Sequence, residues 1–176
     1  MVATFSWVEY NTQATDTGVP TNLNLGSTDA RDLAPSTYPI TAGTYSYSKW
    51  VRGLWIGDFT RIDNLQFWMS TDGGAYCTGE KLNCSATTGT CTTTATYATP
   101  TGGASAEDAG GTMTAIPDAD PTTANIGING SLTGSVTSST APNNVGDYII
   151  VQASIATTAS AGAVNQKTFT LQYDEV

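Results

Sequence analysis

The side chains that most often perform acid-base and nucleophilic chemistry are scarce in this chain. It contains no histidine, so Ser-His-Asp and Cys-His arrangements cannot form and the commonest metal ligand is missing. A pair of carboxylates could still cleave a glycosidic bond, and the candidates are Glu9, Glu80, Glu107 and Glu175. No pattern places two of them on opposite sides of a cleft. The sequence therefore predicts no catalytic residue, no cofactor and no enzymatic activity.

Three cysteines, Cys77, Cys84 and Cys91, are spaced evenly at seven residues. Because the number is odd, at least one thiol stays outside any internal disulfide, and three internal pairings are open. Structural zinc needs four ligands, which this chain cannot supply from cysteine and histidine. Two interpretations remain: a disulfide formed in an oxidising medium, or reduced thiols in a threonine-rich pair of strands.

Acidic residues cluster in two turns, at Asp118 and Asp120 and at Glu107 and Asp108. Carboxylates in flexible loops can bind calcium, but no EF-hand loop is present. We interpret these residues as solvated acidic turns, and the sequence predicts no metal site.

Aromatic and basic residues are concentrated between residues 44 and 70. This segment holds three of the four tryptophans and half of the six basic residues. Arginine next to large aromatic side chains is typical of the most important contacts in protein interfaces. The predicted interface residues are Lys49, Trp50, Arg52, Trp55 and Arg61.

A second interpretation of the same segment is a flat aromatic surface that stacks on sugar rings. Its members would be Trp50, Trp55, Trp68, Tyr45 and Tyr47. At strand spacing, however, such residues more often belong to a core or an interface.

The elements that must position these residues are β-strands. Phe5 and Trp7 alternate with small polar residues, as do Phe169 and Tyr173, and this period of two is typical of strands with one buried face. We expect the two terminal strands to pair or to lie in one sheet. Residues 148 to 173 are expected to form a strand pair.

Residues 44 to 70 predict two longer strands that turn at Gly57-Asp58. The alternation changes phase after Ile62, which indicates a bulge at Asp63-Asn64. Both faces of the first strand carry large side chains, so both are expected to be covered.

Residues 71 to 146 have a different composition, with turn-forming residues every few positions. Ile126, Ile128, Leu132 and Val136 share even positions and predict a strand of about eleven residues. The rest of the region is expected to be a loop or arm insertion, and residues 71 to 112 are expected to be easily cleaved by protease in the isolated protein.

Composition supports one all-β domain spanning residues 1–176, an antiparallel β-sandwich or jelly-roll with this insertion within 71–146. Threonine, glycine and proline punctuate short segments, and 176 residues suit a single core. The net charge of −9 disfavours nucleic acid and anionic membranes as partners. The start of the chain lacks the pattern of a secretory signal, so a cytosolic origin is expected.

The pattern SYSKWVRGLWIGDFTRIDNLQFW, together with the final FTLQYDEV, resembles the small all-β virion proteins of tailed bacteriophages. The resemblance covers the two ends and the central segment, and it implies a virion protein, assembled in the host cytoplasm, that decorates or cements the capsid shell. The implied partner is the major capsid protein, with a homotrimer favoured over other oligomers. No functional residue of that group can be carried over by position.

Two alternatives remain open from the sequence. One is a carbohydrate-binding module of a tail fibre or a cell surface, which would use exposed aromatic residues. The other is a structural protein of the tail or neck, which would build rings by adding strands to one another's sheets.

Overall fold

The described part of the chain consists of β-strands and the loops that connect them. The computed structural model describes residues 2–11, 17–70, 76–86, 100, 102–103, 112–162 and 165–176, and these ranges contain no helix. Within them, no helix is long and apolar enough to cross a membrane. The all-β prediction is confirmed, and the strands are β1 (Ala3–Tyr10), β2 (Thr17–Gly18), β3 (Lys49–Gly57), β4 (Ile62–Ser70), β5 (Glu80–Ala86), β6 (Thr112–Ala115), β7 (Ile149–Ile155) and β8 (Thr168–Glu175).

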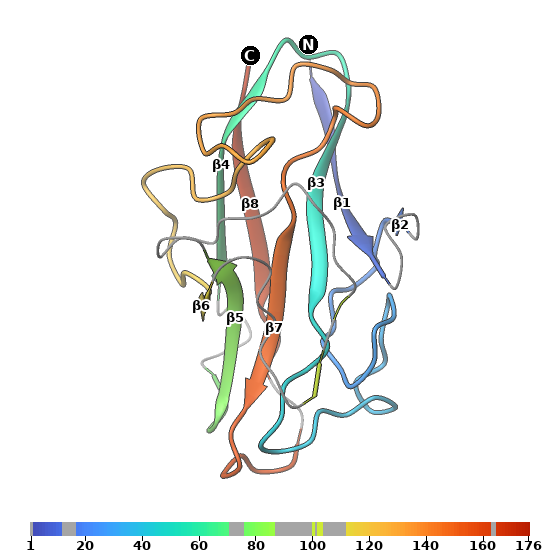
Figure 1. The fold of residues 1–176 in the computed structure, drawn as a ribbon, viewed down its shortest axis with the longest axis vertical. Helices are drawn as coiled ribbons and strands as arrows, with labels where there is room; N and C mark the ends of the chain where they lie inside the picture. Colours follow the sequence, from blue (N-terminus) through green and yellow to red (C-terminus); the bar gives the residue numbers. More distant parts are fainter. Residues whose placement is uncertain are drawn as a thin grey trace.

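The strands form two antiparallel sheets (Figure 1). One sheet has six strands in the order β2-β1-β3-β7-β5-β6, and the other contains only β4 and β8. The longest pairing in the larger sheet joins β1 to β3, from Ala3 opposite Gly57 to Tyr10 opposite Trp50. The long strands run along the long axis of the molecule.

The two sheets share one hydrophobic core. Trp55 of β3 and Val151 of β7 belong to the same buried cluster as Phe67 of β4. Aromatic rings meet across the layers: the Trp7 and Phe67 ring centroids are 6.3 Å apart, and those of Trp55 and Tyr173 are 5.4 Å apart, both edge-on. Such contacts bury large apolar areas, which dominate the stability of a fold of this size.

The larger sheet is covered on its other face as well. Trp50 points away from the shared core and packs in a second buried cluster with Tyr10 and Tyr148. Neither Trp50 nor Trp55 exposes any measurable surface. The prediction that both faces of this strand are covered is therefore confirmed.

The predicted strands of residues 44–70 are present as β3 and β4, and the chain turns after Gly57, whose φ is +98°. They do not pair with each other, because the turn carries the chain from one sheet to the other. The predicted bulge is confirmed: the register of β4 against β8 shifts between Asp63 and Gln66, and Asn64 has a φ of 54°.

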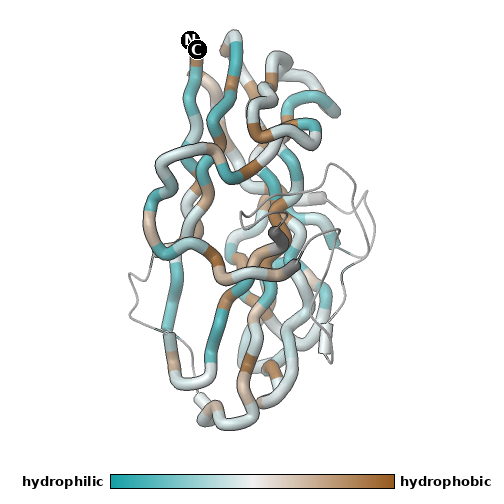
Figure 2. The backbone as a smooth tube through the Cα atoms, turned by 60° about the vertical axis from the view of Figure 1, so that its left-hand side comes forward, coloured by the Kyte–Doolittle hydropathy of each residue, from teal (hydrophilic) through white to brown (hydrophobic). Residues whose placement is uncertain are grey.

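The predicted pairing of the terminal strands is wrong. β1 lies in the six-stranded sheet and β8 in the two-stranded sheet, and they face each other across the core. The backbone N–H of Ala3 donates to Oε1 of Glu175 at 2.9 Å, and both views show the two chain ends together at one end of the molecule (Figures 1 and 2). The expected pair within residues 148–173 is also wrong, since β7 pairs with β3 and β5 and β8 pairs with β4. An aromatic face can be buried by a strand across the core as well as by a neighbour, so alternation alone does not identify partners.

The predicted strand over residues 126–136 is wrong, although three of its four apolar side chains are buried and only Leu132 is exposed. Asn129 and Gly130 have φ values of 54° and 75°, and they fold the chain into a tight turn that brings Ile128 opposite Ser131. Ile126, Ile128 and Val136 still reach the core. Local turn geometry therefore replaces the extended conformation.

Part of the expected insertion is integrated into the larger sheet, because β5 lies between β7 and β6. The rest of the predicted arm (71–75, 87–99, 101 and 104–111) lies outside the described residues. The loops from Pro117 onward run along β4. There the N–H groups of Asn125 and Ile126 donate to the carbonyl of Leu65, and that of Met69 donates to Pro117.

Candidate functional site

Three of the five predicted interface residues are interior residues. Lys49 is 2% exposed, and Trp50 and Trp55 are fully buried. A partner cannot reach these side chains in the folded chain, so the interface prediction is wrong for them. The strand pattern correctly indicates that their faces are covered, but it does not reveal that this chain itself covers them.

Arg52 is partly buried on the outer face of the larger sheet, between two tyrosine rings. Its guanidinium carbon lies 4.6 Å from the ring centroid of Tyr10 and 4.4 Å from that of Tyr148, and its Nη2 donates to the Tyr10 hydroxyl. Burial raises the pKa of Tyr148 to about 12, although the positive charge of Arg52 acts in the opposite direction. The cation-π contacts fix Arg52 in place as part of this surface.

Arg61 is exposed and precedes β4, at the end of the molecule where the chain termini meet. Its Nε lies 2.6 Å from Oδ2 of Asp63, and its backbone N–H donates to the carbonyl of Val176. Arg52 and Arg61 therefore belong to different parts of the surface, and the fold does not bring these two predicted interface residues together.

The sugar-stacking surface proposed from the sequence is also not present as a unit. Trp50 and Trp55 are buried on opposite faces of β3, while Trp68, Tyr45 and Tyr47 are only partly exposed. Five rings in these positions cannot stack on one ligand.

A groove of about 870 Å³ lies at the end of the molecule opposite the chain termini. The groove is lined by the end of β7, the starts of β5 and β8, and residues from the ranges 21–42, 159–162 and 165–167. Figure 1 shows these strand ends away from the N and C labels. Its apolar wall includes Leu23, Ile40 and Phe169. The volume is in the range of small-ligand pockets, which usually combine an apolar wall with a few polar groups.

One polar group of this groove is an ion pair between Lys167 and Glu80. Their Nζ and Oε2 atoms are 3.5 Å apart, and both side chains are about 95% buried. Lys167 also lies 5.3 Å above the ring of Tyr76. Burial raises the pKa of Tyr76, and the Glu80 charge raises it further. The pair therefore adds two opposite charges to the lining of this groove.

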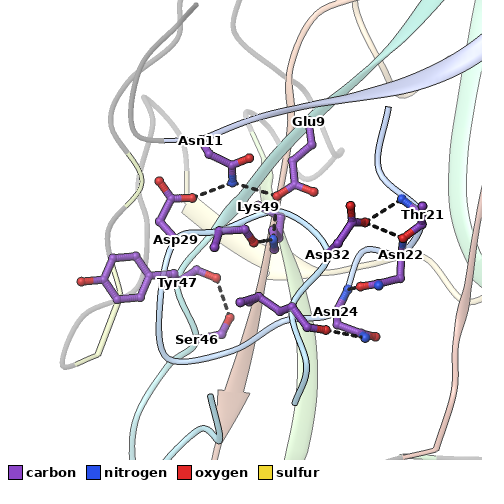
Figure 3. A network of polar contacts seen from close by, with 12 residues as sticks. Glu9, Asn11, Thr21, Asn22, Asn24, Asp29, Asp32, Ser46, Tyr47 and Lys49 are labelled. Atoms are coloured by element: carbon purple, nitrogen blue, oxygen red, sulfur yellow. Dashed lines mark hydrogen bonds and ion pairs between the residues drawn. The ribbon is translucent and has the colours of Figure 1, made fainter. Parts of the chain in front are cut away.

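A second buried ion pair joins β1 to β3 and forms the centre of a polar network (Figure 3). Nζ of Lys49 lies 2.6 Å from Oε1 of Glu9 and also donates to the carbonyl of Ala30. Nδ2 of Asn11 donates to the same Glu9 oxygen at 2.8 Å and to Oδ1 of Asp29 at 2.8 Å. No sequence pattern links these residues, because Glu9, Asn11 and Lys49 meet through the register of the sheet and Asp29 and Ala30 belong to a loop that folds over them.

The loop that covers this network is held by Asp32. Its Oδ1 accepts hydrogen bonds from the hydroxyl and the N–H of Thr21, and from the N–H of Asn22 (Figure 3). The hydrogen bonds from Thr21 hold the pKa of Asp32 below its usual value. Asp32 therefore acts as a fixed acceptor that closes residues 21–33 over the ion pair.

The cysteines divide into two kinds. Cys84 is disulfide-bonded, whereas Cys77 remains a thiol, with its backbone N–H donating to Glu80. Cys91 lies outside the described residues. In the ranges that the structure covers, no three potential metal ligands gather, and Asp118 and Asp120 are exposed.

Comparison with known proteins gives no relative: no protein-family model, curated protein or solved structure matches this chain.

Proposed function

We propose that this chain is a structural protein of a tailed-phage virion that decorates the capsid shell and stabilises it by binding the major capsid protein. The observation that carries the proposal is the contrast between a larger sheet whose faces are covered within the chain and a smaller sheet with one open edge. Such a chain has a rigid body and a place where another chain can join it.

The open edge belongs to β8. This strand pairs with β4 over residues Ile62 to Ser70, and among the described residues nothing pairs with its other edge. By contrast, the free edge of β4 is covered: Asn125 donates from Nδ2 to the Phe67 carbonyl and accepts the Phe67 N–H at Oδ1. We assign the β8 edge to a strand of the capsid protein, because strand addition gives a fixed orientation without any reactive group.

The domain is a β-sandwich or jelly-roll in this proposal, and residues 1–176 form a single unit. The support is the shared core, to which both sheets contribute buried side chains. A homotrimer is proposed as the assembled form, since a trimer that spans several capsid subunits gains affinity from contacts that become intramolecular. Arg52 and Arg61 are the two predicted interface residues that remain accessible for it.

The partner is a protein and neither nucleic acid nor membrane. Fifteen acidic residues against six basic ones repel phosphate groups, and two of the three lysines are committed to buried ion pairs. The protein would therefore stay on the outside of the shell, in the virion.

The proposal is tested with purified capsid shells and the isolated chain. Shells that bind the chain at a fixed ratio to the capsid protein, and that then release their genome at a higher temperature than bare shells, are expected. Unchanged release temperature with no co-sedimentation would reject it.

A second candidate is a carbohydrate-binding module, and the groove favours it. The groove adds amide groups of Asn22, Asn24 and Gln166 to its apolar wall, and these groups can hydrogen-bond sugar hydroxyls. Binding of the isolated chain to a glycan array, with no binding to shells, would select this candidate.

A further inference from the structure

A lysine, a carboxylate and a carboxamide share one water-excluded site where β1 ends beside β3. Lys49, Glu9 and Asn11 are 2%, 0% and 3% exposed. No part of the proposed capsid role requires these three groups to be buried together, so the site calls for its own explanation.

Their geometry converges on a single oxygen. Oε1 of Glu9 accepts from Nζ of Lys49 at 2.6 Å and from Nδ2 of Asn11 at 2.8 Å (Figure 3). The register explains why they meet: Tyr10 is opposite Trp50, so the next position brings Asn11 opposite Lys49 on the neighbouring strand. Cross-strand neighbours on one face are about 5 Å apart at Cβ, which a lysine side chain spans easily.

Among the residues that the structure describes, two buried atoms of the site find no hydrogen-bond partner. They are Oε2 of Glu9 and Oδ1 of Asn11. Buried polar atoms in purely structural networks are almost always satisfied, so unpaired atoms next to a nucleophile are unusual. Rotation of the Asn11 amide would turn its Oδ1 toward the Glu9 carboxyl group, where a protonated carboxyl could donate to it.

We infer that Lys49 and Asn11 become joined by an intramolecular isopeptide bond, with Glu9 carrying the proton. In the first step, one proton passes from the Lys49 ammonium to the Glu9 carboxylate, which removes both buried charges and leaves a neutral amine. The Nζ lone pair then attacks Cγ of Asn11 while the Glu9 carboxyl group donates to its carbonyl oxygen.

The reaction balances without any other reactant. A bond forms between Nζ and Cγ, and the bond between Cγ and Nδ2 breaks. Nδ2 takes its third hydrogen from the attacking nitrogen by way of Glu9 and leaves as ammonia. Glu9 returns to a carboxylate when the proton that it first took from Lys49 passes to this ammonia, which departs as ammonium. The product is a secondary amide, and the chain becomes lighter than its sequence by the mass of one ammonia.

The positions of the reacting groups would make the formation of this bond fast. The two strands hold the amine and the carboxamide side by side, and Glu9 touches both, so the reaction is unimolecular. Exclusion of water leaves the amine without a competing nucleophile. The second buried pair, Lys167 and Glu80, supplies a natural contrast. Lys167 also donates to the backbone carbonyl of Asn165, and Oε2 of Glu80 accepts from Lys167 and from the backbone N–H of Cys77.

The experiment is mass spectrometry of the folded full chain after denaturation. The wild-type chain is expected to be lighter than its sequence by one ammonia, and Glu9→Gln, Lys49→Met and Asn11→Ala are each expected to restore the full mass. Lys167→Met and Lys81→Met are the matched controls, which are expected to keep the loss.

Tryptic digestion then locates the bond. Trypsin cannot cleave after a modified Lys49, so residues 1–31 should appear covalently joined to residues 32–52. A full-mass wild-type chain overturns the inference. An ammonia loss confined to residues 1–31 also overturns it, because such a loss indicates cyclisation of an asparagine within that peptide. A loss of water in place of ammonia would mean that a carboxylate side chain had formed the amide, and it would reject the role of Asn11.

Discussion

The two sheets differ in how completely the chain itself covers their faces and edges. The six-stranded sheet has large side chains buried on both faces, and a charged pair closes one end of its β1–β3 ladder. The two-stranded sheet has one edge sealed by Asn125 and the other open along β8. We conclude that the larger sheet determines the stability of the fold and that the β8 edge determines association. Substitutions in the larger sheet should therefore destabilise the chain, whereas substitutions on the β8 edge should alter only the binding of a partner.

The largest effect is expected from Lys49→Met in the larger sheet. This change removes the cation of the buried pair with Glu9, and with it the cross-link that we infer between Lys49 and Asn11. Removing one member of a buried pair alone costs about 3–5 kcal/mol. Urea unfolding followed by tryptophan fluorescence measures the loss. The exposed Lys81→Met should shift the free energy of unfolding by less than about 0.5 kcal/mol, and equal effects of the two changes would contradict the assigned role of the pair.

The next largest effect is expected from Asn125→Ala, at the sealed edge of the smaller sheet. Its amide satisfies both the N–H and the carbonyl of Phe67, at 2.7 and 2.8 Å. Leaving these groups unpaired should destabilise the chain by about 1–3 kcal/mol. The exposed Asn143→Ala is a control for the change of residue type, and a stability equal to wild type in Asn125→Ala would mean that the edge is not sealed by this side chain.

A smaller, pH-dependent effect is expected from Tyr148 on the outer face of the larger sheet. In the folded chain the pKa of Tyr148 is about 12, whereas in the unfolded chain it lies near the usual value of 10.0. The unfolded state therefore binds fewer protons between these values, and stability falls as pH rises through that window while remaining intact below it. Thermal unfolding of Tyr148→Phe should show a shallower decline above pH 10 than wild type, and identical profiles would argue against a buried phenol.

The smallest effect on stability, and the largest on association, is expected from Thr170→Lys in the middle of β8. A lysine on an open edge opposes the approach of another strand but disturbs few contacts within the chain. We expect the free energy of unfolding to change by less than about 0.5 kcal/mol and the affinity for capsid shells to fall at least tenfold. Thr137→Lys, on an exposed loop, is the control; if both variants bind like wild type, β8 is not the docking edge.

The sequence was informative about strands and much less so about their partners. Alternation identified β1, β3, β4, β7 and β8, and a change of phase located the bulge near Asn64, because these features depend on local side-chain direction. Pairing depends on which layer each strand enters, and the turn at Gly57 suits a crossing between sheets as well as a hairpin. The same limit hid the site, since Glu9 and Lys49 are forty residues apart and only the register brings Asn11 beside them.

The connectivity of the sheets also governs how the chain folds. The long ladders join distant segments: β1 to β3, β3 to β7, and β4 to β8, in which Ile62 meets Glu175. Closing such large loops before any contact is gained makes folding slow, with times of about milliseconds to seconds for proteins rich in distant strand pairs. Until β8 arrives, β4 has no strand partner, so newly made chains should be most prone to aggregate before their last strand is in place.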